Sequence, residues 1–268
     1  MIRFKLCMLK TIRVIILGVS AWLAVAGQAL ASLPSDELLK EANRLYKEYK
    51  DGDALQKFEL VLAQDPQNYE ALYKLSLLDL RIGYRFQDET QKIQFFTLAK
   101  EYAQKALDVN SQGADAHYAM AAALNNLSVV TGIKERLIAM REVKEHLDKA
   151  LAINPAHADA WQLLGRWHYK VANLNFFECT ASKLLSGGVP VGASNYNAVE
   201  ALQKSIQYNP ENISSYYDLA TIYRNMKNSV KSIEVLEKAI KLQLVTSDDL
   251  ELSRRCKAML HELGKTSV

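Results

Sequence analysis

Side chains that do acid–base, nucleophilic or metal chemistry are few in this sequence, and their spacing does not fit those reactions. The chain has five histidines and three cysteines. No Cys-x-x-Cys, His-Glu-x-x-His or Gly-x-Ser-x-Gly segment occurs, so the common zinc, metalloprotease and serine-hydrolase patterns are missing from the sequence. His117, His157 and His168 occupy positions of a repeated pattern that already explain them structurally. We therefore predict a non-enzymatic protein without catalytic, metal-binding or cofactor-binding residues.

Two further candidates for chemistry also have simpler explanations. His146 lies in a stretch of mixed charge, where Glu142–His146 and Glu145–Lys149 have the i,i+4 spacing of surface pairs on a helix. Gly264-Lys265-Thr266 is similar to the end of a phosphate-binding loop, but the glycine required five residues earlier is Met259. The sequence therefore predicts a protein that binds rather than one that catalyses.

The charge balance limits the classes of partner. Residues 1–31 contain four of the 33 basic residues and no acid, which leaves 29 basic against 30 acidic residues in the rest of the chain. A nucleic-acid-binding face needs clustered lysine and arginine to displace counterions, and no basic run remains, so we predict no nucleic-acid partner. Cys179 and Cys256 lie far apart in the repeat order, which favours two free thiols over a disulfide.

The first 31 residues have the pattern of an export signal. A basic segment, Met1–Arg13, precedes an apolar stretch, Val14–Gly27, and Ala29-Leu30-Ala31 has the small residues of a cleavage site. We predict cleavage after Ala31 and a mature domain, 32–268, in the periplasm or cell envelope. The alternative is a retained membrane anchor, because the apolar stretch approaches the roughly 20 residues that span a bilayer.

The remaining sequence repeats a helical phrase. A large apolar residue is followed three places later by a small one, and Asn-Pro or Asp-Pro then ends the helix, as in Leu147, Ala150 and Asn154-Pro155. The next helix places an aromatic residue or histidine before a leucine and a small residue, as in Trp161-x-x-Leu164-Gly165. These features match the tetratricopeptide signature. The sequence predicts an all-α, tetratricopeptide-type α-solenoid of about five helix pairs.

The phrase also sets the predicted boundaries of the domain. The second and third repeats exceed the 34-residue unit by about three helical turns, which predicts longer helices in the same phase. An insertion at 173–197 reads as an extra short helix followed by a glycine-rich loop, and the chain ends in a capping helix. The predicted repeats are 35–68, 69–113, 114–157, 158–212 and 213–246, and the predicted cap is 247–264.

One stretch carries a family resemblance. Gly132–Pro155, GIKERLIAMREVKEHLDKALAINP, together with LLGRWHYKVANL and the inserted helix after it, resembles the regulator of microtubule dynamics family. The resemblance implies an adaptor-like repeat domain. In some animal relatives it implies association with microtubules, and in one it implies a phospholipid held in the concave groove. Because an exported protein does not meet cytosolic tubulin, we predict a secreted bacterial relative whose concave face binds a protein or peptide.

The first helices of successive repeats are expected to line that concave face. Counting positions along these helices gives a set rich in tyrosine, asparagine and arginine, which supply aromatic surface and hydrogen bonds. The alternatives are an ordinary solvated inner face, or a groove that binds a lipid or other amphiphile. The predicted partner-binding residues are Tyr73, Arg81, Tyr118, Asn125, Asn126, Arg166, Tyr169, Lys170, Tyr217 and Arg224.

The inserted helix carries four large apolar residues, Phe176, Phe177, Leu184 and Leu185. They are predicted to form a lid over the groove or a contact with a membrane surface. The alternative is simple packing against the fourth and fifth repeats. The oligomeric state is not predicted by the sequence.

Overall fold

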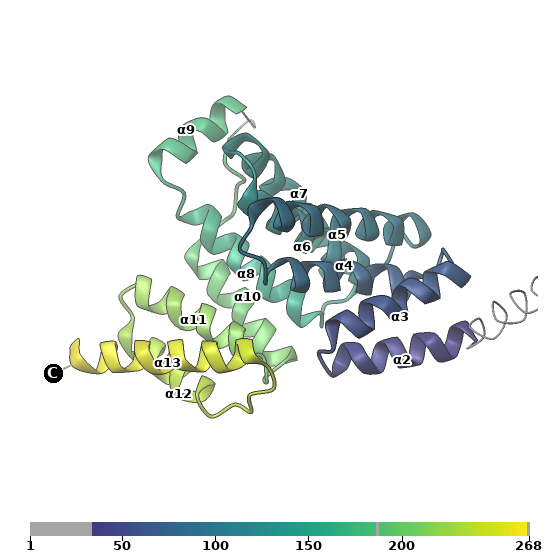
Figure 1. The fold of residues 1–268 in the computed structure, drawn as a ribbon. Helices are drawn as coiled ribbons and strands as arrows, with labels where there is room; N and C mark the ends of the chain where they lie inside the picture. The colour runs from purple at the N-terminus through teal and green to yellow at the C-terminus, as the bar shows by residue number, and fades with distance from the viewer. Residues whose placement is uncertain (1–33, 186–187, 267–268) are drawn as a thin grey trace, which may run out of the picture.

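The computed structural model describes residues 34–185 and 188–266, and all regular structure within them is helical (Figure 1). The predicted export signal lies outside these residues. No helix in the described part combines the length and apolar character needed to cross a membrane. The helices are α2 (Ser35–Lys47), α3 (Asp51–Gln64), α4 (Tyr69–Gly83), α5 (Glu89–Val109), α6 (Ala114–Val130), α7 (Ile133–Ile153), α8 (Ala158–Ala172), α9 (Phe176–Leu185), α10 (Asn195–Tyr208), α11 (Ile213–Asn225), α12 (Ser229–Ala239) and α13 (Ser247–Thr266).

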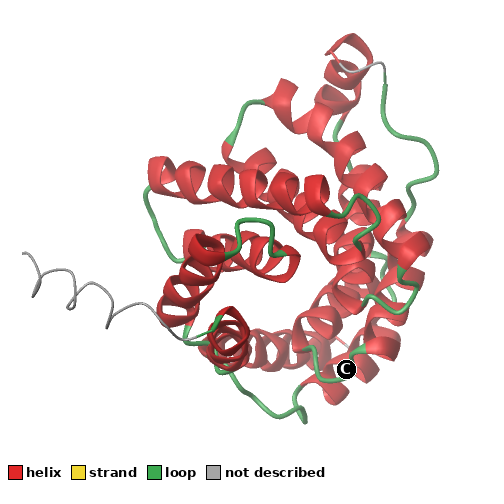
Figure 2. Cartoon of the chain, turned by 90° about the vertical axis from the view of Figure 1, so that its right-hand side faces the viewer, coloured by secondary structure: helices red, strands yellow, loops and turns green. Residues whose placement is uncertain are grey.

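Ten of these helices form five consecutive pairs. The pairs are α2 with α3, α4 with α5, α6 with α7, α8 with α10, and α11 with α12. Helix α9 is inserted between the members of the fourth pair, and α13 packs on α11 and α12. The pairs follow one another along a curved path (Figure 2). This arrangement confirms the predicted tetratricopeptide-type solenoid with an inserted helix and a C-terminal cap.

The repeat boundaries share one local turn. The side-chain oxygen of an Asp or Asn at the end of a second helix accepts a hydrogen bond from the backbone N–H two residues later, at 3.0–3.3 Å. Such turns offer the backbone an alternative to continuing the helix. The second helices of the second and third pairs, α5 and α7, are each 21 residues long, against 14 for α3, as the repeat spacing predicts. The turn residues are Asp65, Asn110, Asn154 and Asn209.

Small residues let the first helices pack closely in the middle of the solenoid. The main core cluster contains five buried alanines of α6 and joins α4 to α8. Trp167 on α8 is 4% exposed, and its indole Nε1 donates to the carbonyl of Met140 on α7 at 2.7 Å. Burial of such a side chain with its N–H paired contributes a large share of the hydrophobic stabilisation. This core fixes α6 and α8, which carry several of the predicted binding residues.

The predicted Glu142–His146 surface pair is wrong. The imidazole of His146 instead lies against His117 of α6, with 2.9 Å between the two Nδ1 atoms. Burial lowers the pKa of both histidines, that of His146 to about 4, so both rings are neutral at pH 7. Because Nε2 of His117 lies 3.1 Å from the carbonyl oxygen of Ser111, it carries the proton and donates. His146 Nδ1–H therefore donates to Nδ1 of His117, and the pair ties α6 to α7.

Both cysteines of the described residues are free thiols. Cys179 is half-buried on α9, and Cys256 is fully buried on α13. Burial raises the pKa of the Cys256 thiol to about 11, so this side chain is an unreactive part of the core. The structure agrees with the expectation of two thiols and no disulfide.

Candidate functional site

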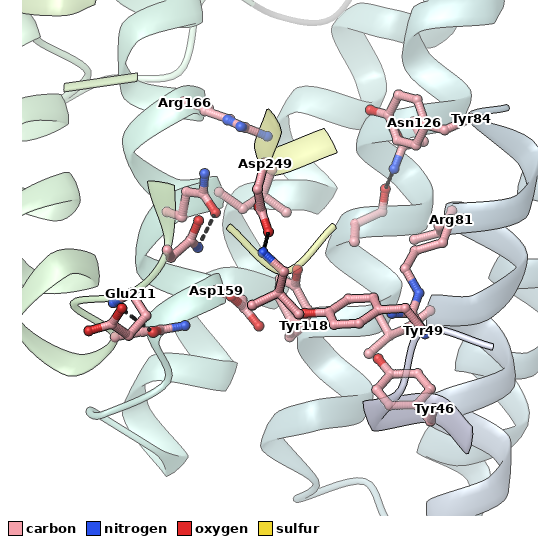
Figure 3. A pocket seen from close by; sticks show the side chains of 18 of the residues that line it. Tyr46, Tyr49, Arg81, Tyr84, Tyr118, Asn126, Asp159, Arg166, Glu211 and Asp249 are labelled. Carbon is pink, nitrogen blue, oxygen red and sulfur yellow. Dashed lines mark hydrogen bonds between the residues drawn. The ribbon is translucent and has the colours of Figure 1, made fainter. Parts of the chain in front are cut away.

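A pocket of about 820 Å³ lies where the first helices of four successive pairs face a common space (Figure 3). Its walls come from α2, α4, α6 and α8, and its end comes from the loops before α11 and α13. The lining is mostly polar and aromatic rather than aliphatic: it includes four tyrosines, two arginines and four asparagines. No group of three or more metal-binding side chains occurs in the part of the chain that the structure describes.

Half of the residues predicted for partner binding line this pocket. They project from three consecutive first helices, α4, α6 and α8, and counting along the repeat places them on one face of each helix. The structure brings together Arg81, Tyr118, Asn125, Asn126 and Arg166.

The other half lies outside the pocket. Tyr73 packs on Tyr69, with 5.2 Å between ring centroids. The hydroxyl of Tyr169 accepts a hydrogen bond from the side-chain amide of Asn225. Arg224 forms an ion pair with Glu262 at 3.5 Å. These three side chains therefore have partners within the solenoid.

Lys170 and Tyr217 also have other surroundings. Lys170 is half-buried on α8, where burial lowers the pKa of its ammonium group, the charge of Arg136 on α7 lowers it further, and that of Glu178 on α9 raises it. Tyr217 packs against the C-terminal core cluster of α11, α12 and α13. On α11 the counting along the repeat failed because the loop before the helix, rather than the helix itself, lines the pocket.

Several pocket residues were not predicted from the sequence. Most lie in loops, which have no helical position to count. Tyr49 follows α2 with φ of 57°, in the left-handed region that side chains seldom adopt. The repeated Asx turn offered a usable signal for Asn209 and Glu211, because it marks the start of each first helix and these two residues form it before α11. The residues missed include Tyr46, Tyr49, Tyr84, Asp159, Asn209, Glu211, Asn212, Gln243, Val245 and Asp249.

Arg81 is held at one end of the pocket by a buried carboxylate. Asp51, at the start of α3, has a fully buried side chain and forms ion pairs with Arg81, at 2.8 Å, and with Arg85. The guanidinium carbon of Arg81 lies 4.2 Å from the ring centroid of Tyr46 and 5.4 Å from that of Tyr49. Cation–π contact and ion pairing thus fix this arginine against the tyrosine wall.

Arg166 is held at the other end by residues of α11. Its Nε donates to Oδ2 of Asp218 at 2.6 Å, and its Nη2 donates to Ser214 Oγ at 2.7 Å. Gln162 donates to the same two acceptors, and the Asn212 amide donates to Gln162 Oε1 at 3.1 Å. This network joins the fourth pair to the fifth and gives the pocket a preorganised polar end.

Helix α9 projects from the body of the solenoid and is not part of the pocket lining (Figure 1). It packs on α7, where Glu178 pairs with Arg136 at 3.2 Å and Arg141 donates to the carbonyl of Gly188 at 2.9 Å. The side chains of Phe176, Phe177 and Leu184 are 88%, 70% and 80% exposed. The side chain of Leu185, at the end of α9, lies outside the part of the chain whose side chains the structure describes.

The succession of helix pairs around a polar pocket places this protein in the class of tetratricopeptide-type helical-repeat scaffolds. Solved structures agree with this fold. A thermophilic tetratricopeptide protein of Thermus thermophilus, TTC0263, superposes with a TM-score of 0.61 at 19% identity over 84% of this chain and 98% of that chain. PilF of Pseudomonas aeruginosa superposes with a TM-score of 0.53 at 15% identity over 87% of this chain and 89% of that chain.

Sequence comparison identifies the family within this class. The family model for regulator of microtubule dynamics protein 1-3 matches residues 38–264, and this chain belongs to that family. Regulator of microtubule dynamics protein 3 of Xenopus laevis is 31% identical over 65% of this chain and 38% of that protein. Regulator of microtubule dynamics protein 1 of Bos taurus is 24% identical over 84% of this chain and 71% of that protein. The chain spans less than half of the length of the first type 3 relatives it matches.

Proposed function

We propose that the protein is a non-enzymatic adaptor whose pocket binds an extended peptide segment of a protein partner. The observation that carries this proposal is the continuity of the pocket across the first helices of four repeats. With packed helices 8–10 Å apart, four of them present roughly 30 Å of surface, the length of about nine extended residues. Asparagine, glutamine and arginine side chains along that surface supply the donors and acceptors that a peptide backbone needs.

The proposed setting is the cell envelope of a bacterium. Support for export comes from the basic and apolar pattern of residues 1–31 and the small residues before Ser32. In such a setting the microtubule association implied by the family name would not apply, whereas binding in the pocket would. The mass of the chain purified from its source tests the setting, because an exported, processed chain begins at Ser32 and a retained anchor leaves the chain uncut.

Filling the pocket is expected to weaken peptide binding at least about tenfold, or roughly 1.4 kcal/mol. Asn125 lies in the pocket lining, and its side chain makes no hydrogen bond among the described residues, so Asn125→Trp adds bulk there without removing a side-chain hydrogen bond. Ligands for the measurement come from a random-peptide phage library selected on the full chain. Their affinities for the parent and the variant are then compared by fluorescence anisotropy.

The matched control for this variant is Gln94→Trp, an exposed amide on α5 outside the pocket. It is expected to bind the selected peptides as the parent does. Equal affinities for Asn125→Trp and the parent would show that the peptides bind elsewhere, and the proposed function would be abandoned.

A second candidate role, contact with a membrane, is favoured by the exposure of α9. Large apolar side chains this exposed on one projecting helix are unusual for a surface that meets only water. We expect a Phe177→Trp variant to show blue-shifted emission, and quenching by brominated lipid, in phosphatidylglycerol-containing vesicles. Gln94→Trp is the control for a tryptophan on the body of the solenoid, and the spectrum of the parent chain is subtracted from both. Identical spectra for the two variants would rule out insertion of α9.

A further inference from the structure

The arginines that line the pocket have ion-pair partners, whereas the carboxylates that line it have none among the described residues. Each of its two arginines already has a carboxylate partner: Asp51 for Arg81, at 2.8 Å, and Asp218 for Arg166, at 2.6 Å. Neither partner lines the pocket. The arginines therefore offer little net positive charge to a ligand, because an acidic ligand group would have to compete with an ion pair that is already formed.

The carboxylates of the pocket lack such partners. Asp159, Glu211 and Asp249 all line it, and no basic side chain of the described residues pairs with any of them within 4 Å. The carboxylate of Asp249 accepts from the backbone N–H groups of Val245 and Thr246. Lys47 is exposed at the rim. Lys47 has no carboxylate partner among the described residues, so three unpaired carboxylates against this one lysine leave a net negative charge for a ligand, and Asp159 contributes to it from within a first helix.

Asp159 lies beside the tyrosine wall. In the pocket Asp159 and Tyr118 are neighbours, with Tyr46, Tyr49 and Arg81 beyond them (Figure 3). The pKa of Tyr118 is raised well above its usual value by burial and next by the negative charge of Asp159. Asp159 is exposed to the space of the pocket, yet desolvation by the surrounding protein atoms raises the pKa of its carboxyl, and the neighbouring His157 opposes this rise only in part. A cation placed here would therefore relieve an uncompensated negative charge.

The tyrosines of this wall are suited to a cation. The guanidinium of Arg81 already lies over the ring of Tyr46, which shows that these rings accept a cation on one face. The ring of Tyr118 packs on His157, with 4.8 Å between centroids, and is thereby held in place. His157 in turn lies 3.5 Å from Asp115, a carboxylate outside the pocket lining. The wall is thus fixed before any ligand arrives.

We propose that the pocket takes a basic side chain, a lysine or arginine of the bound peptide, beside Tyr118 with Asp159 as its counter-ion. This inference rests on the peptide-binding function proposed above and names the ligand chemistry of the same site. A carboxylate and an aromatic face together recognise a cation through ion pairing and cation–π contact. An acidic side chain at the same point would meet the uncompensated charge of Asp159 and be rejected.

The chain offers a matched pair of variants for the test. Asp159 and Asp36 are both exposed acidic residues in the first turn of a first helix, α8 and α2 respectively. Asp159→Asn removes the pocket charge with little change in shape, and Asp36→Asn makes the same change outside the pocket. Thermal melts of both variants show whether either substitution alters the fold rather than the site.

The measurement compares peptides selected from a random-peptide phage library on the full-length parent chain. We expect them to share a lysine or arginine at one position. Replacing that residue with norleucine is expected to weaken binding about tenfold for the parent and for Asp36→Asn, and to have no effect for Asp159→Asn. Peptides without a common basic position, or an undiminished preference for the basic peptide in Asp159→Asn, would overturn the inference while pocket binding stands. If Asn125→Trp weakens none of the selected peptides, the peptide-binding function itself fails.

Discussion

Replacing Asp79 with asparagine is expected to remove most of the loss in the free energy of unfolding that this carboxyl causes as the pH rises. Asp79 lies on α4 with 3% of its surface exposed, and its Oδ2 is buried without a hydrogen-bond partner in the described residues. Burial raises the pKa of this carboxyl from 3.8 to about 7, and the nearby charge of Glu59 adds to the rise. At neutral pH the folded chain therefore carries a carboxyl that resists ionisation.

The sign of the effect follows from the direction of the shift. A carboxyl with a raised pKa in the folded state binds its proton more tightly there than in the unfolded chain. Its contribution to stability is fully present below pH 3.8 and is lost as the pH rises through about 7. The difference of about three pKa units corresponds to at most about 4 kcal/mol in the free energy of unfolding.

Urea unfolding at pH 4 and pH 8 measures this contribution. The parent chain is expected to lose up to about 4 kcal/mol more than Asp79→Asn over this range. Asp53→Asn, an exposed carboxyl in the neighbouring helix α3, is the control and should follow the parent. If Asp79→Asn and the parent lose the same stability between the two pH values, Asp79 is not buried and uncompensated in solution.

The fold was predictable because its signals are local. The Asn-Pro and Asp-Pro stops, and the large and small residues three apart, recur along the chain and are read without knowledge of tertiary contacts. Even Asn110, which has no proline after it, forms the same turn as its counterparts. The lengths of α5 and α7 followed from the spacing alone.

The pocket was predictable only where a helix face determines it. Arg81, Tyr118 and Arg166 belong to a stripe that positional counting finds. The partners that hold the arginines, Asp51 and Asp218, lie on other helices, 30 and 52 residues away, and no periodic pattern joins them. The same reason explains the error at His146, whose partner lies on α6. Loop residues of the pocket depend on how the fifth pair is placed, which is a tertiary property.

Gly165 belongs both to the repeat signature and to the packing contact between α8, which lines the pocket, and α10. It lies on α8 in the Leu-Gly of the signature, fully inside the contact between α8 and α10. A Cβ atom built there lies 2.7 Å from Cγ of Leu202 and 3.1 Å from the backbone oxygen of Ala198. Neither is the far end of a flexible side chain, so α10 itself has to move to admit a methyl group.

Gly165→Ala is therefore expected to lower the free energy of unfolding by about 1–3 kcal/mol, although alanine is the better helix former by about 1 kcal/mol. Gly52→Ala on α3 is the matched control, because nothing lies within 4 Å of a Cβ there, and it should stabilise the chain by roughly 0.5–1 kcal/mol. Urea unfolding of both variants measures the difference. Since α8 also carries Asp159, Gln162 and Arg166, displacement of α10 from α8 should weaken peptide binding in Gly165→Ala and leave it unchanged in Gly52→Ala. Stabilisation by both substitutions would show that α8 and α10 do not approach as closely in solution.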